Sequence, residues 1–415
     1  MTIFLSWYHF LWSFLGALFF GFPSKQIFVF GVTGTKGKST VLELINAILE
    51  AAGKKTALLS SIRIKINKQS QKNYLDNTMP GRAFIQRFLK EAVKAGCDYV
   101  LVEVTSQGVL QHRHSFIKWS AALFTNLAPE HIEAHGGFEN YRKTKGDFFR
   151  CVVNQKSPSQ KLIFINQDDS SAQYFAEAAK GPLSRNRNSF QQGQGGKIIF
   201  YSKSEIRNYK LTIPGSLSGD FNLENIAGAI AFAKSQGIDE KNTREAIKNF
   251  CGVPGRMDIV QTEPFAAVID YAHTPDSLEK VYQSLRQKFL SADKQAKLIC
   301  VLGSAGGGRD KWKRPKMGEI AAKYCEEIIL TNEDPYDENP LEIMDQIESG
   351  IKNKKADKIL NRQEAIRKAL SLAKKGDAVV ITGKGCEPWL HLENGKKIPW
   401  DERKTVANEI QNLRT

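Results

Sequence analysis

The sequence predicts an α/β protein: a central P-loop-type domain with a parallel sheet, followed by a C-terminal Rossmann-like α/β domain. Short buried strands alternate with helical stretches, and the alternation restarts after the turn-like V-P-G-R that begins at Val253. A length of 415 residues exceeds one ordinary domain. We expect an apolar N-terminal helix over residues 1–24, a central domain over 25–250 and a C-terminal domain over 251–415.

The central domain is expected to open with a strand at Gln26–Phe30, a glycine-rich loop at Gly31–Thr40 and a helix at Val41–Ala52. The polar segment Leu183–Lys197 is expected to form a surface loop. The remaining buried strands are expected at Tyr99–Val104, Ala121–Thr125 and Leu162–Asn166, then at Ala266–Asp270, Lys297–Leu302, Glu327–Thr331 and Ala378–Thr382.

An uncharged, apolar segment runs from Ile3 to Phe22, close to the ~20 residues that a membrane-spanning helix needs. A cleaved secretory signal is not favoured, because no basic residue precedes the segment and no A-x-A site follows it. On a helix, His9, Ser13 and Gly16 would form a narrow, weakly polar stripe. Three interpretations stay open: a membrane anchor, an interfacial helix and a helix packed on the protein.

The composition points to a cytoplasmic protein with an acidic partner. The formal net charge is +15, but no RNP, zinc-finger or basic-helix signature accompanies it, so a small acidic substrate is favoured over nucleic acid. The six cysteines contain no C-x-x-C pair, which argues against a zinc site and a disulfide framework. We expect a monomer, which an N-terminal anchor would attach to the inner face of the cytoplasmic membrane.

The glycine-rich loop has the chemistry of a phosphate-binding loop, although its spacing is shorter than that of the Walker A motif. Glycines let backbone N–H groups converge on phosphate oxygens, and the following helix adds its positive end. Lys38 would contact the terminal phosphates of ATP, and Ser39 or Thr40 would help to hold Mg²⁺. The alternative is a turn without a ligand. The expected nucleotide contacts are Gly34, Thr35, Lys36, Gly37, Lys38, Ser39 and Thr40.

Glu103 is expected at the end of a buried strand, where open α/β sheets place their ligands. An ionised carboxylate in such a place needs a cation, and Mg²⁺ at a phosphate site would supply one.

Several motifs occur in the order typical of Mur ligases. The loop G-T-K-G-K-S-T resembles that family's G-T-x-G-K-[ST]-T, and V-E-V-T-S-Q-G-V-L-Q-H-R and F-T-N-L-A-P-E-H-I-E-A-H-G resemble two later segments. G-D-F-N-L-E-N, V-P-G-R-M-D and D-Y-A-H-T-P-D-S-L-E complete the set, and the last is the most specific. The sequence is most similar to the MurE type, the UDP-N-acetylmuramoyl-tripeptide synthetases, over residues 27 to about 403.

The resemblance implies an ATP-dependent ligase of peptidoglycan precursor synthesis, which activates the carboxylate of a UDP-N-acetylmuramoyl-peptide-like acceptor and joins it to an amino acid. It implies that His131 is a second metal ligand and that Lys145 is carbamylated, where the plainer alternatives are a structural histidine and a surface lysine. Further nucleotide contacts are implied for Asn222, Asn225, Arg256, Asp270 and His273. Acceptor contacts are implied for Thr78, Ser106, Gln111 and Arg113, and amino-acid contacts for Arg309, Glu333, Asp334, Tyr336, Gly383 and Glu387.

The sequence departs from the family pattern in three ways. The phosphate loop starts at residue 31, so the family's N-terminal UDP-binding domain is missing from this sequence and uridine recognition is in doubt. E-D-P-Y at Glu333–Tyr336 replaces D-N-P-R, which removes an arginine that could grip a distal carboxylate. We therefore expect an amine other than meso-diaminopimelate, such as lysine or another diamino acid. Gln107 and Cys386 also differ from the family's residues, without removing a required charge.

Two alternatives belong to different classes of function. One is another amino-acid ligase of the same superfamily, similar to folylpolyglutamate synthases, with an acceptor that carries no UDP. The other is a nucleotide-binding membrane scaffold without catalysis, against which the joint presence of Lys38, Glu103, His131 and Lys145 argues.

Overall fold

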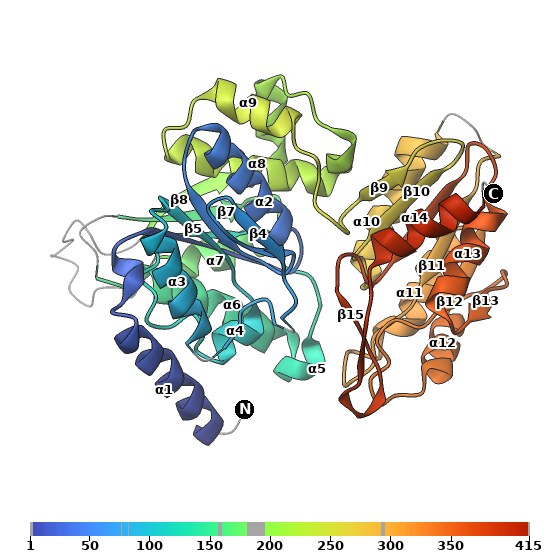
Figure 1. Ribbon diagram of the computed structural model, residues 1–415, viewed down its shortest axis with the longest axis horizontal. Helices are drawn as coiled ribbons and strands as arrows, with labels where there is room; N and C mark the ends of the chain where they lie inside the picture. The colour runs from blue at the N-terminus through green and yellow to red at the C-terminus, as the bar shows by residue number, and fades with distance from the viewer. Residues whose placement is uncertain are drawn as a thin grey trace. The chain divides into compact units, whose positions relative to one another are not determined.

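The computed structural model describes residues 3–75, 77–81, 83–156, 160–180, 196–291 and 295–413. The chain divides into two compact units, and the main division falls between Phe250 and Cys251. Two short segments, Glu130–Ala134 and Gly215–Gly219, group with the second unit although they precede this division. Both units are α/β structures, so the predicted fold class is confirmed (Figure 1).

The first unit is built on an eight-stranded sheet with the order β4-β3-β2-β5-β1-β6-β7-β8. The strands are β1 (Phe28–Thr33), β2 (Thr56–Leu59), β3 (Arg63–Ile66), β4 (Gln69–Lys72), β5 (Tyr99–Glu103), β6 (Ala121–Phe124), β7 (Lys161–Asn166) and β8 (Gly196–Tyr201). All pairings are parallel except those of β3 with β2 and with β4. The carboxyl ends of β1, β5 and β6 therefore meet at one edge of the sheet, which is where such sheets bind ligands.

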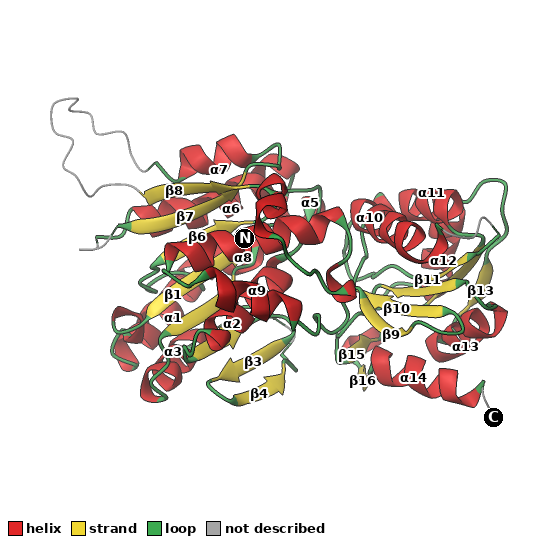
Figure 2. Cartoon of the chain, turned by 90° about the horizontal axis from the view of Figure 1, so that it is seen from above, coloured by secondary structure: helices red, strands yellow, loops and turns green. Residues whose placement is uncertain are grey.

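Helices cover both faces of this sheet (Figure 2). The side chains of Phe88, Val109, Phe148 and Phe175 pack with alternate strand residues into one buried core. On the other face, Phe232 contacts Phe30 with ring centroids 4.5 Å apart. The helices are α1 (Ile3–Phe19), α2 (Lys38–Ala51), α3 (Phe84–Lys94), α4 (Ser106–Leu110), α5 (Ile132–His135), α6 (Phe138–Val153), α7 (Ala172–Ala178), α8 (Asp220–Ser235) and α9 (Glu240–Lys248), with 3₁₀ turns η1 (Pro23–Lys25) and η2 (Lys203–Tyr209).

The second unit has a six-stranded sheet with the order β13-β12-β11-β14-β10-β9, parallel except for the edge strand β9. A separate hairpin joins β15 and β16. The strands are β9 (Asp258–Gln261), β10 (Ala266–Asp270), β11 (Leu298–Leu302), β12 (Glu327–Thr331), β13 (Asp357–Ile359), β14 (Ala378–Thr382), β15 (Trp389–His391) and β16 (Lys397–Pro399). The helices are α10 (Pro275–Leu285), α11 (Lys313–Tyr324), α12 (Pro340–Glu348), α13 (Arg362–Leu372) and α14 (Glu402–Asn412), with short turns η3 (Gly215–Leu217), η4 (Arg286–Leu290) and η5 (Glu393–Gly395).

Half of the sixteen strands of the described residues were not predicted from the sequence, and several predicted boundaries were wrong. The first strand begins at Phe28 rather than Gln26, and α2 begins at Lys38 rather than Val41, because the turn at Gly37 already starts the helix. Most of the predicted loop at Leu183–Lys197 lies outside the described residues, but Gly196 and Lys197 belong to β8. Pairing with β7 supplies the hydrogen bonds that hold this segment extended, and its own polarity gave no sign of it.

The apolar segment at the N-terminus forms a shorter helix than its composition suggested. α1 has 17 residues and ends at Phe19, where Gly21 and Phe22 take left-handed backbone conformations and stop it. Within the described ranges, no helix combines the length and apolar composition that crossing a membrane requires. α1 packs on the first unit along one side, with Gly16 against Ala83.

Candidate active site

The phosphate-loop segment, Gly31–Thr40, runs from the end of β1 into the first turn of α2 at the carboxyl edge of the first sheet. Two of its glycines have left-handed backbones and no room for a side chain. A Cβ on Gly34 would lie 1.9 Å from Thr125 Oγ1, and a Cβ on Gly37 would lie 2.3 Å from Asn225 Oδ1. Only glycine fits at these two positions, so the loop backbone is fixed closely against its neighbours.

The loop is tethered by residues that follow β6. Thr125 donates its hydroxyl to the Lys36 carbonyl at 2.7 Å, and Asn126 Oδ1 accepts the Lys36 N–H at 2.9 Å. The Lys38 ammonium donates to the carbonyls of Gly34 and Thr35 at 3.2 and 2.9 Å. A rigid loop with a lysine folded back over it, at the start of a helix, is a preorganised site for phosphate oxygens.

Glu103, at the end of β5, lies next to this loop. Its Oε2 accepts hydrogen bonds from the hydroxyl of Ser39 at 2.9 Å and from the backbone and hydroxyl of Ser61 at 3.0 and 3.2 Å. Its Oε1 is 4.0 Å from the Lys38 ammonium. The structure therefore brings together three of the residues predicted to serve phosphate and metal, and adds Ser61, which the sequence did not indicate.

Lys145 on α6 reaches the same loop from the other side. Its ammonium donates to the Gly34 carbonyl at 2.7 Å and lies 4.7 Å from the centre of the Tyr141 ring. Only 2% of the residue is exposed, so it is not a surface lysine. The Tyr141 hydroxyl in turn lies 3.1 Å from Thr35 Oγ1. Lys145 is thus a buried cation at the phosphate loop.

Asn222 and Asn225 lie on the first turns of α8 and are buried. The Asn225 amide donates to Asn222 Oδ1 at 3.1 Å, and the same Asn225 side chain lies against Gly37. Asn225 thus adjoins the phosphate loop and Asn222 adjoins Asn225, while their nucleotide-contacting role remains a prediction.

The residues expected to hold an acceptor lie around α4. Ser106, the first residue of α4, lies 3.1 Å from His135 Nε2. Arg113 donates to the Met79 carbonyl, while its buried Nε has no hydrogen-bond partner among the described residues. The same holds for the buried Oε1 of Gln111. Thr78 is half-buried beside Met79.

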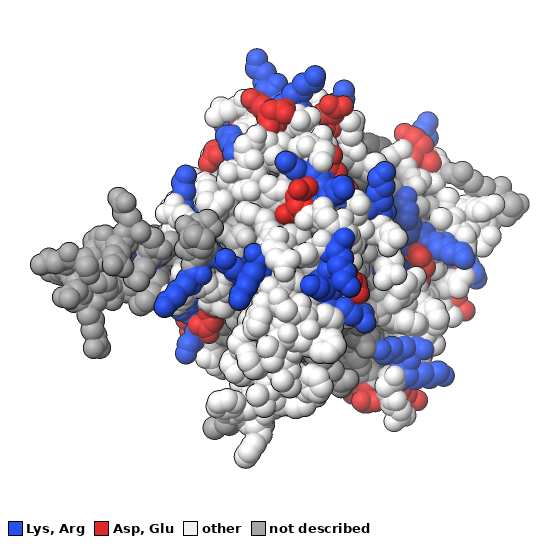
Figure 3. Space-filling model, turned by 60° about the vertical axis from the view of Figure 1, so that its left-hand side comes forward, with Lys and Arg blue, Asp and Glu red and all other residues white. Residues whose placement is uncertain are grey.

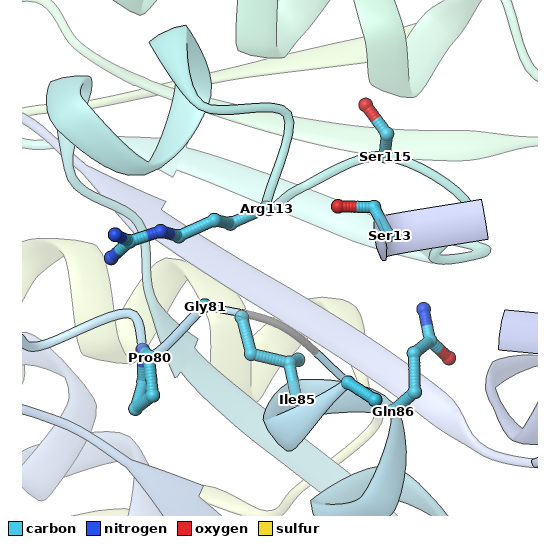
Figure 4. A pocket seen from close by; sticks show the side chains of 8 residues that line it. Ser13, Pro80, Gly81, Ile85, Gln86, Arg113 and Ser115 are labelled. Atoms are coloured by element: carbon cyan, nitrogen blue, oxygen red, sulfur yellow. The ribbon is translucent and has the colours of Figure 1, made fainter. Parts of the chain in front are cut away.

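Arg113 lines a small pocket with Pro80, Gly81 and Ser13 (Figure 4). Burial lowers the pKa of the Arg113 guanidinium, as expected for a cation that is short of partners. An anion at this pocket would supply the missing acceptor.

In the second unit, Asp270 ends β10 and holds the following turn. Its oxygens accept the N–H groups of Met257 at 2.7 Å and Ala272 at 2.8 Å. Arg256 lies over the Tyr271 ring at 4.0 Å. Asp270 therefore positions backbone here, which is compatible with shaping a nucleotide contact through Arg256.

His273 lies in the second unit, and His131 lies in the short segment Glu130–Ala134 that groups with it. His273 Nε2 lies 2.8 Å from Glu130 Oε1, and Nδ1 lies 2.7 Å from the Tyr271 carbonyl. His131 has a left-handed backbone. The next two N–H groups, of Ile132 and Glu133, donate to Asp310. The assignment of His131 as a metal ligand remains a prediction.

A second group of charges, here named the acidic cluster, consists of Glu333, Asp334, Lys384 and Glu387. The buried Lys384 ammonium donates to Asp334 at 2.7 Å and to Glu387 at 2.6 Å. Burial opposes the charge on Lys384, but the two carboxylates outweigh burial and raise its pKa. Burial likewise opposes ionisation of Glu387, yet Lys384 and the Tyr271 hydroxyl, 2.6 Å away, lower its pKa to about 2.

Glu333 differs from the other members of the acidic cluster. Burial raises its pKa to about 7, and the nearby charge of Arg362 offsets this only in part. Its Oε2 is buried with no hydrogen-bond partner in the described parts of the chain, and a Cβ on Gly383 would lie 2.2 Å from that oxygen. A buried carboxylate oxygen without a donor is a place where an ammonium group would be held.

Arg309, Tyr336 and His391 form a neighbouring group. The Tyr336 and His391 rings stack with centroids 4.9 Å apart, and the Arg309 guanidinium lies 5.9 Å from the Tyr336 ring. The structure thus brings together in the second unit all six residues expected to contact the amino acid, Arg309, Glu333, Asp334, Tyr336, Gly383 and Glu387.

The donors at the phosphate loop fit a magnesium ion. The Ser39 hydroxyl and the Glu103 carboxylate are hard oxygen donors, and Mg²⁺ is usually bound by one or two protein oxygens together with phosphate oxygens and water. No group of three His, Cys, Asp or Glu side chains suited to a metal occurs in the ranges that the structure describes. The phosphate-bound type of Mg²⁺ site is therefore the one that these residues favour.

The profile of the Mur ligase middle domain matches residues 32–233, and that of the Mur ligase glutamate ligase domain matches residues 255–385. The chain belongs to the Mur ligase family. As a Mur ligase, it is an ATP-dependent carbon–nitrogen ligase, and the resemblance to the MurE type is confirmed by its relatives.

Two of these relatives are named UDP-N-acetylmuramoyl-L-alanyl-D-glutamate–2,6-diaminopimelate ligases. The protein of Syntrophomonas wolfei is 37% identical over 96% of this chain and 81% of its own length, and that of Aquifex aeolicus is 36% identical over 94% and 78%. A solved structure of such a ligase matches with a TM-score of 0.59 at 27% identity, covering 94% of this chain and 79% of its own. Folylpolyglutamate synthase of Mycobacterium tuberculosis matches with a TM-score of 0.67 but only 14% identity, over 97% of this chain and 95% of its own, which shows a shared fold alone.

Reading the sequence of this Mur ligase missed several side chains at the site. Ser61, Thr125, Asn126 and His135 touch predicted site residues, and Lys384 holds the acidic cluster together. Thr125 and Asn126 stand in the F-T-N-L segment, so that motif offered a signal. Ser61 follows β2 in an ordinary turn, and no local pattern marked it.

Proposed function

We propose that this Mur ligase joins an amino acid to the terminal carboxylate of a UDP-N-acetylmuramoyl-peptide-like acceptor in the cytoplasm, as a step of peptidoglycan precursor synthesis. The observation that carries the proposal is the assembly of Lys38, the Ser39–Glu103 pair and Lys145 around one glycine loop. Such an assembly serves phosphoryl transfer, and the relatives named above are ligases of this acceptor class.

The reaction needs two steps. The acceptor carboxylate first attacks the γ-phosphorus of ATP, which releases ADP and leaves an acyl phosphate. The amine then attacks the acyl carbon, loses a proton and expels phosphate, leaving the amide. The first step brings two anions together, and the second places negative charge on the acyl oxygen and the departing phosphate, so fixed positive charge matters more than a covalent nucleophile.

The residues of the chain divide this work. Lys38 and the N-terminus of α2 attract the phosphates, while Thr125 and Asn126 hold the loop in shape. Ser39 and Glu103 would hold Mg²⁺, which would neutralise phosphate charge when bound. Arg113, with its unpartnered Nε, would orient the acidic acceptor. The loop and its lysines are thus placed to lower the electrostatic barrier of the first step.

Lys145 is proposed to carry a carbamate. A carbamate on its nitrogen would turn a buried cation into an oxygen ligand, next to the loop where a second Mg²⁺ would be useful. The buried position supports the proposal, since a group of this kind must be shielded from water to persist.

The amine is proposed to be a diamino acid other than meso-diaminopimelate, such as lysine. Tyr336 occupies the place of the arginine expected in diaminopimelate-adding enzymes, and its ring is held by His391. The Oε2 atom of Glu333, which has no hydrogen-bond partner in the described parts of the chain, would receive an ammonium group. Recognition of a distal amine fits these residues better than recognition of a distal carboxylate.

The test is phosphate release from ATP with UDP-N-acetylmuramoyl-L-alanyl-D-glutamate and a panel of amino acids. We expect turnover that requires both the acceptor and an amine, with lysine preferred over meso-diaminopimelate. Preference for meso-diaminopimelate would contradict the proposed amine alone. Nucleotide binding without turnover on this acceptor, combined with turnover on a folate or a lipid-linked acceptor, would contradict the proposed substrate.

A further inference from the structure

The N-terminal helix α1 packs on the first unit with its polar and small side chains rather than with most of its large apolar ones. Its polar and small residues face the protein: Ser6 Oγ lies 2.9 Å from His112 Nε2, and Ser13 donates to the His112 carbonyl at 2.9 Å. A Cβ on Gly16 would lie 2.9 Å from Ala83, so the helix sits close to the unit there. The usual amphipathic helix does the opposite and buries its apolar side.

Most of the large apolar side chains of α1 point away from the protein, whereas Phe10 and Phe14 pack against Phe116 with ring centroids 5.0 and 5.2 Å apart. Phe4 is 89% exposed, Trp7 61% and Phe19 82%. The exposed set is Phe4, Leu5, Trp7, Tyr8, Phe10, Leu11, Trp12, Phe14, Leu15, Leu18 and Phe19. At 3.6 residues per turn these positions without Phe10 and Phe14 cover an arc of about 160° around the helix. A protein partner that packs along one seam buries a narrower stripe of the helix surface. Lipid can bury the whole exposed arc.

The surroundings of this helix carry positive charge. The sequence contains no Asp or Glu before Glu43. Lys25 follows α1 in η1, and α3, which packs beside α1, carries Arg87, Lys90 and Lys94 against a single acidic residue. The view of this side shows the uncharged lobe of α1 with Lys and Arg side chains on the surface next to it (Figure 3). Such a rim is complementary to anionic headgroups.

We infer that α1 is an interfacial helix that docks this enzyme on an anionic membrane surface. The residues from Ser6 to Ala17 that face the unit stay on the protein, while the exposed arc enters the boundary between headgroups and acyl chains. Trp7, Tyr8 and Trp12 suit that depth, since their rings combine an apolar body with a polar edge. A helix held along one side by its own protein lies in the plane of the membrane rather than across it.

Flotation of the full-length protein with vesicles tests this inference. The vesicles are phosphatidylcholine alone or mixed with phosphatidylglycerol. We expect binding to the mixed vesicles that weakens as salt is raised. The triple variant Trp7→Gln, Leu11→Gln, Leu18→Gln, within the exposed arc, should lower the bound fraction about tenfold or more, because these side chains would be the ones buried in lipid.

The matched control makes the same amino-acid changes at exposed apolar positions elsewhere: Trp312→Gln, Leu341→Gln, Leu360→Gln. It should bind vesicles as the wild type does. Equal loss in both variants would overturn the inference. So would a wild type that stays off the vesicles and instead forms dimers in sedimentation velocity that the α1 variant abolishes, because the arc would then face a second copy of the chain.

Brominated lipids give a second readout. Tryptophan fluorescence of the wild type should be quenched on binding, and the variant Trp7→Phe, Trp12→Phe should bind but lose most of the quenching. Unchanged quenching in that variant would show that another part of the chain meets the lipid. The phosphate loop is untouched by these changes, so ATP turnover should be retained, and failure of the proposed ligase reaction would leave the vesicle result unaffected.

Discussion

The phosphate loop and the acidic cluster are both built from buried charge, but they hold it in different ways. At the phosphate loop, the ammonium groups of Lys38 and Lys145 donate to backbone carbonyls, and close packing of glycines fixes the loop backbone. In the acidic cluster, Lys384 rests on two carboxylates, and a third carboxylate, on Glu333, titrates near neutral pH. The first arrangement depends on backbone geometry, whereas the second changes its charge with pH.

The largest effect is expected at the phosphate loop. Lys38→Ala removes the ammonium that we propose contacts the terminal phosphates, and we expect kcat to fall about 10³-fold. Phosphate release with saturating acceptor and amine measures it. Lys54→Ala, an exposed lysine after α2, should change nothing. If Lys38→Ala kept more than a tenth of the activity, the loop would not be preorganised for phosphoryl transfer in the way described.

The second-largest effect is expected at Glu103, the carboxylate beside the phosphate loop. Glu103→Gln keeps the shape and the hydrogen bonds to oxygen but removes the charge, so we expect about a 10²-fold loss of kcat and a higher Mg²⁺ concentration for half-saturation. Ser61→Ala, which removes one donor to Glu103, should shift the Mg²⁺ titration in the same direction by less. Glu91→Gln on α3 serves as the control. An unchanged Mg²⁺ titration in Glu103→Gln would exclude this carboxylate as a metal ligand.

The variant Lys145→Ala tests whether the active form of this side chain is the ammonium group or the carbamate. We expect a loss of about tenfold or more in kcat, with partial recovery on adding acetate, because a small carboxylate can enter the space left and replace the carbamate oxygens. Lys143→Ala, exposed on the same helix, is the matched control. Recovery with methylamine rather than acetate would show that the bare ammonium is the active form.

The smallest effect is a pH dependence confined to the acidic cluster. With a pKa of about 7, Glu333 is mostly protonated at pH 6 and mostly ionised at pH 8. If its carboxylate holds the amine, KM for the amine should fall about tenfold over this range, and Glu333→Gln should remove that fall. Glu342→Gln, exposed on α12, should behave as the wild type. A wild-type slope that persists in Glu333→Gln would assign the titration to another group.

The stability of the protein should follow the same carboxyl group. Because the folded state raises the pKa of Glu333, ionisation disfavours folding increasingly as pH rises from the unfolded value of about 4.3 to about 7. The Tm difference between Glu333→Gln and the wild type should therefore grow over this interval and level off above it. Thermal unfolding monitored at pH 5, 7 and 8.5 would measure it, and a difference independent of pH would contradict the assignment.

The sequence by itself determined the fold class, seven of the sixteen strands of the described residues to within one residue, and the position of the phosphate loop. These features depend on neighbours along the chain: a buried strand, a run of glycines and a helix start are local. Lys38 and Ser39 lie within one motif. Glu103 lies at the end of a strand that its buried, apolar sequence predicted. The same local logic failed at Lys197, where pairing with β7 rather than composition decided the structure.

Only the tertiary structure decided which distant side chains meet. Ser61 reaches Glu103, Lys145 reaches Gly34, and Lys384 joins Asp334 to Glu387, because the parallel strands end at a common edge of each sheet. The orientation of α1 was equally hidden, since an apolar segment shows the same composition whichever side faces the protein. Contacts between residues far apart in sequence depend on packing and burial, and these exist only once the chain has folded.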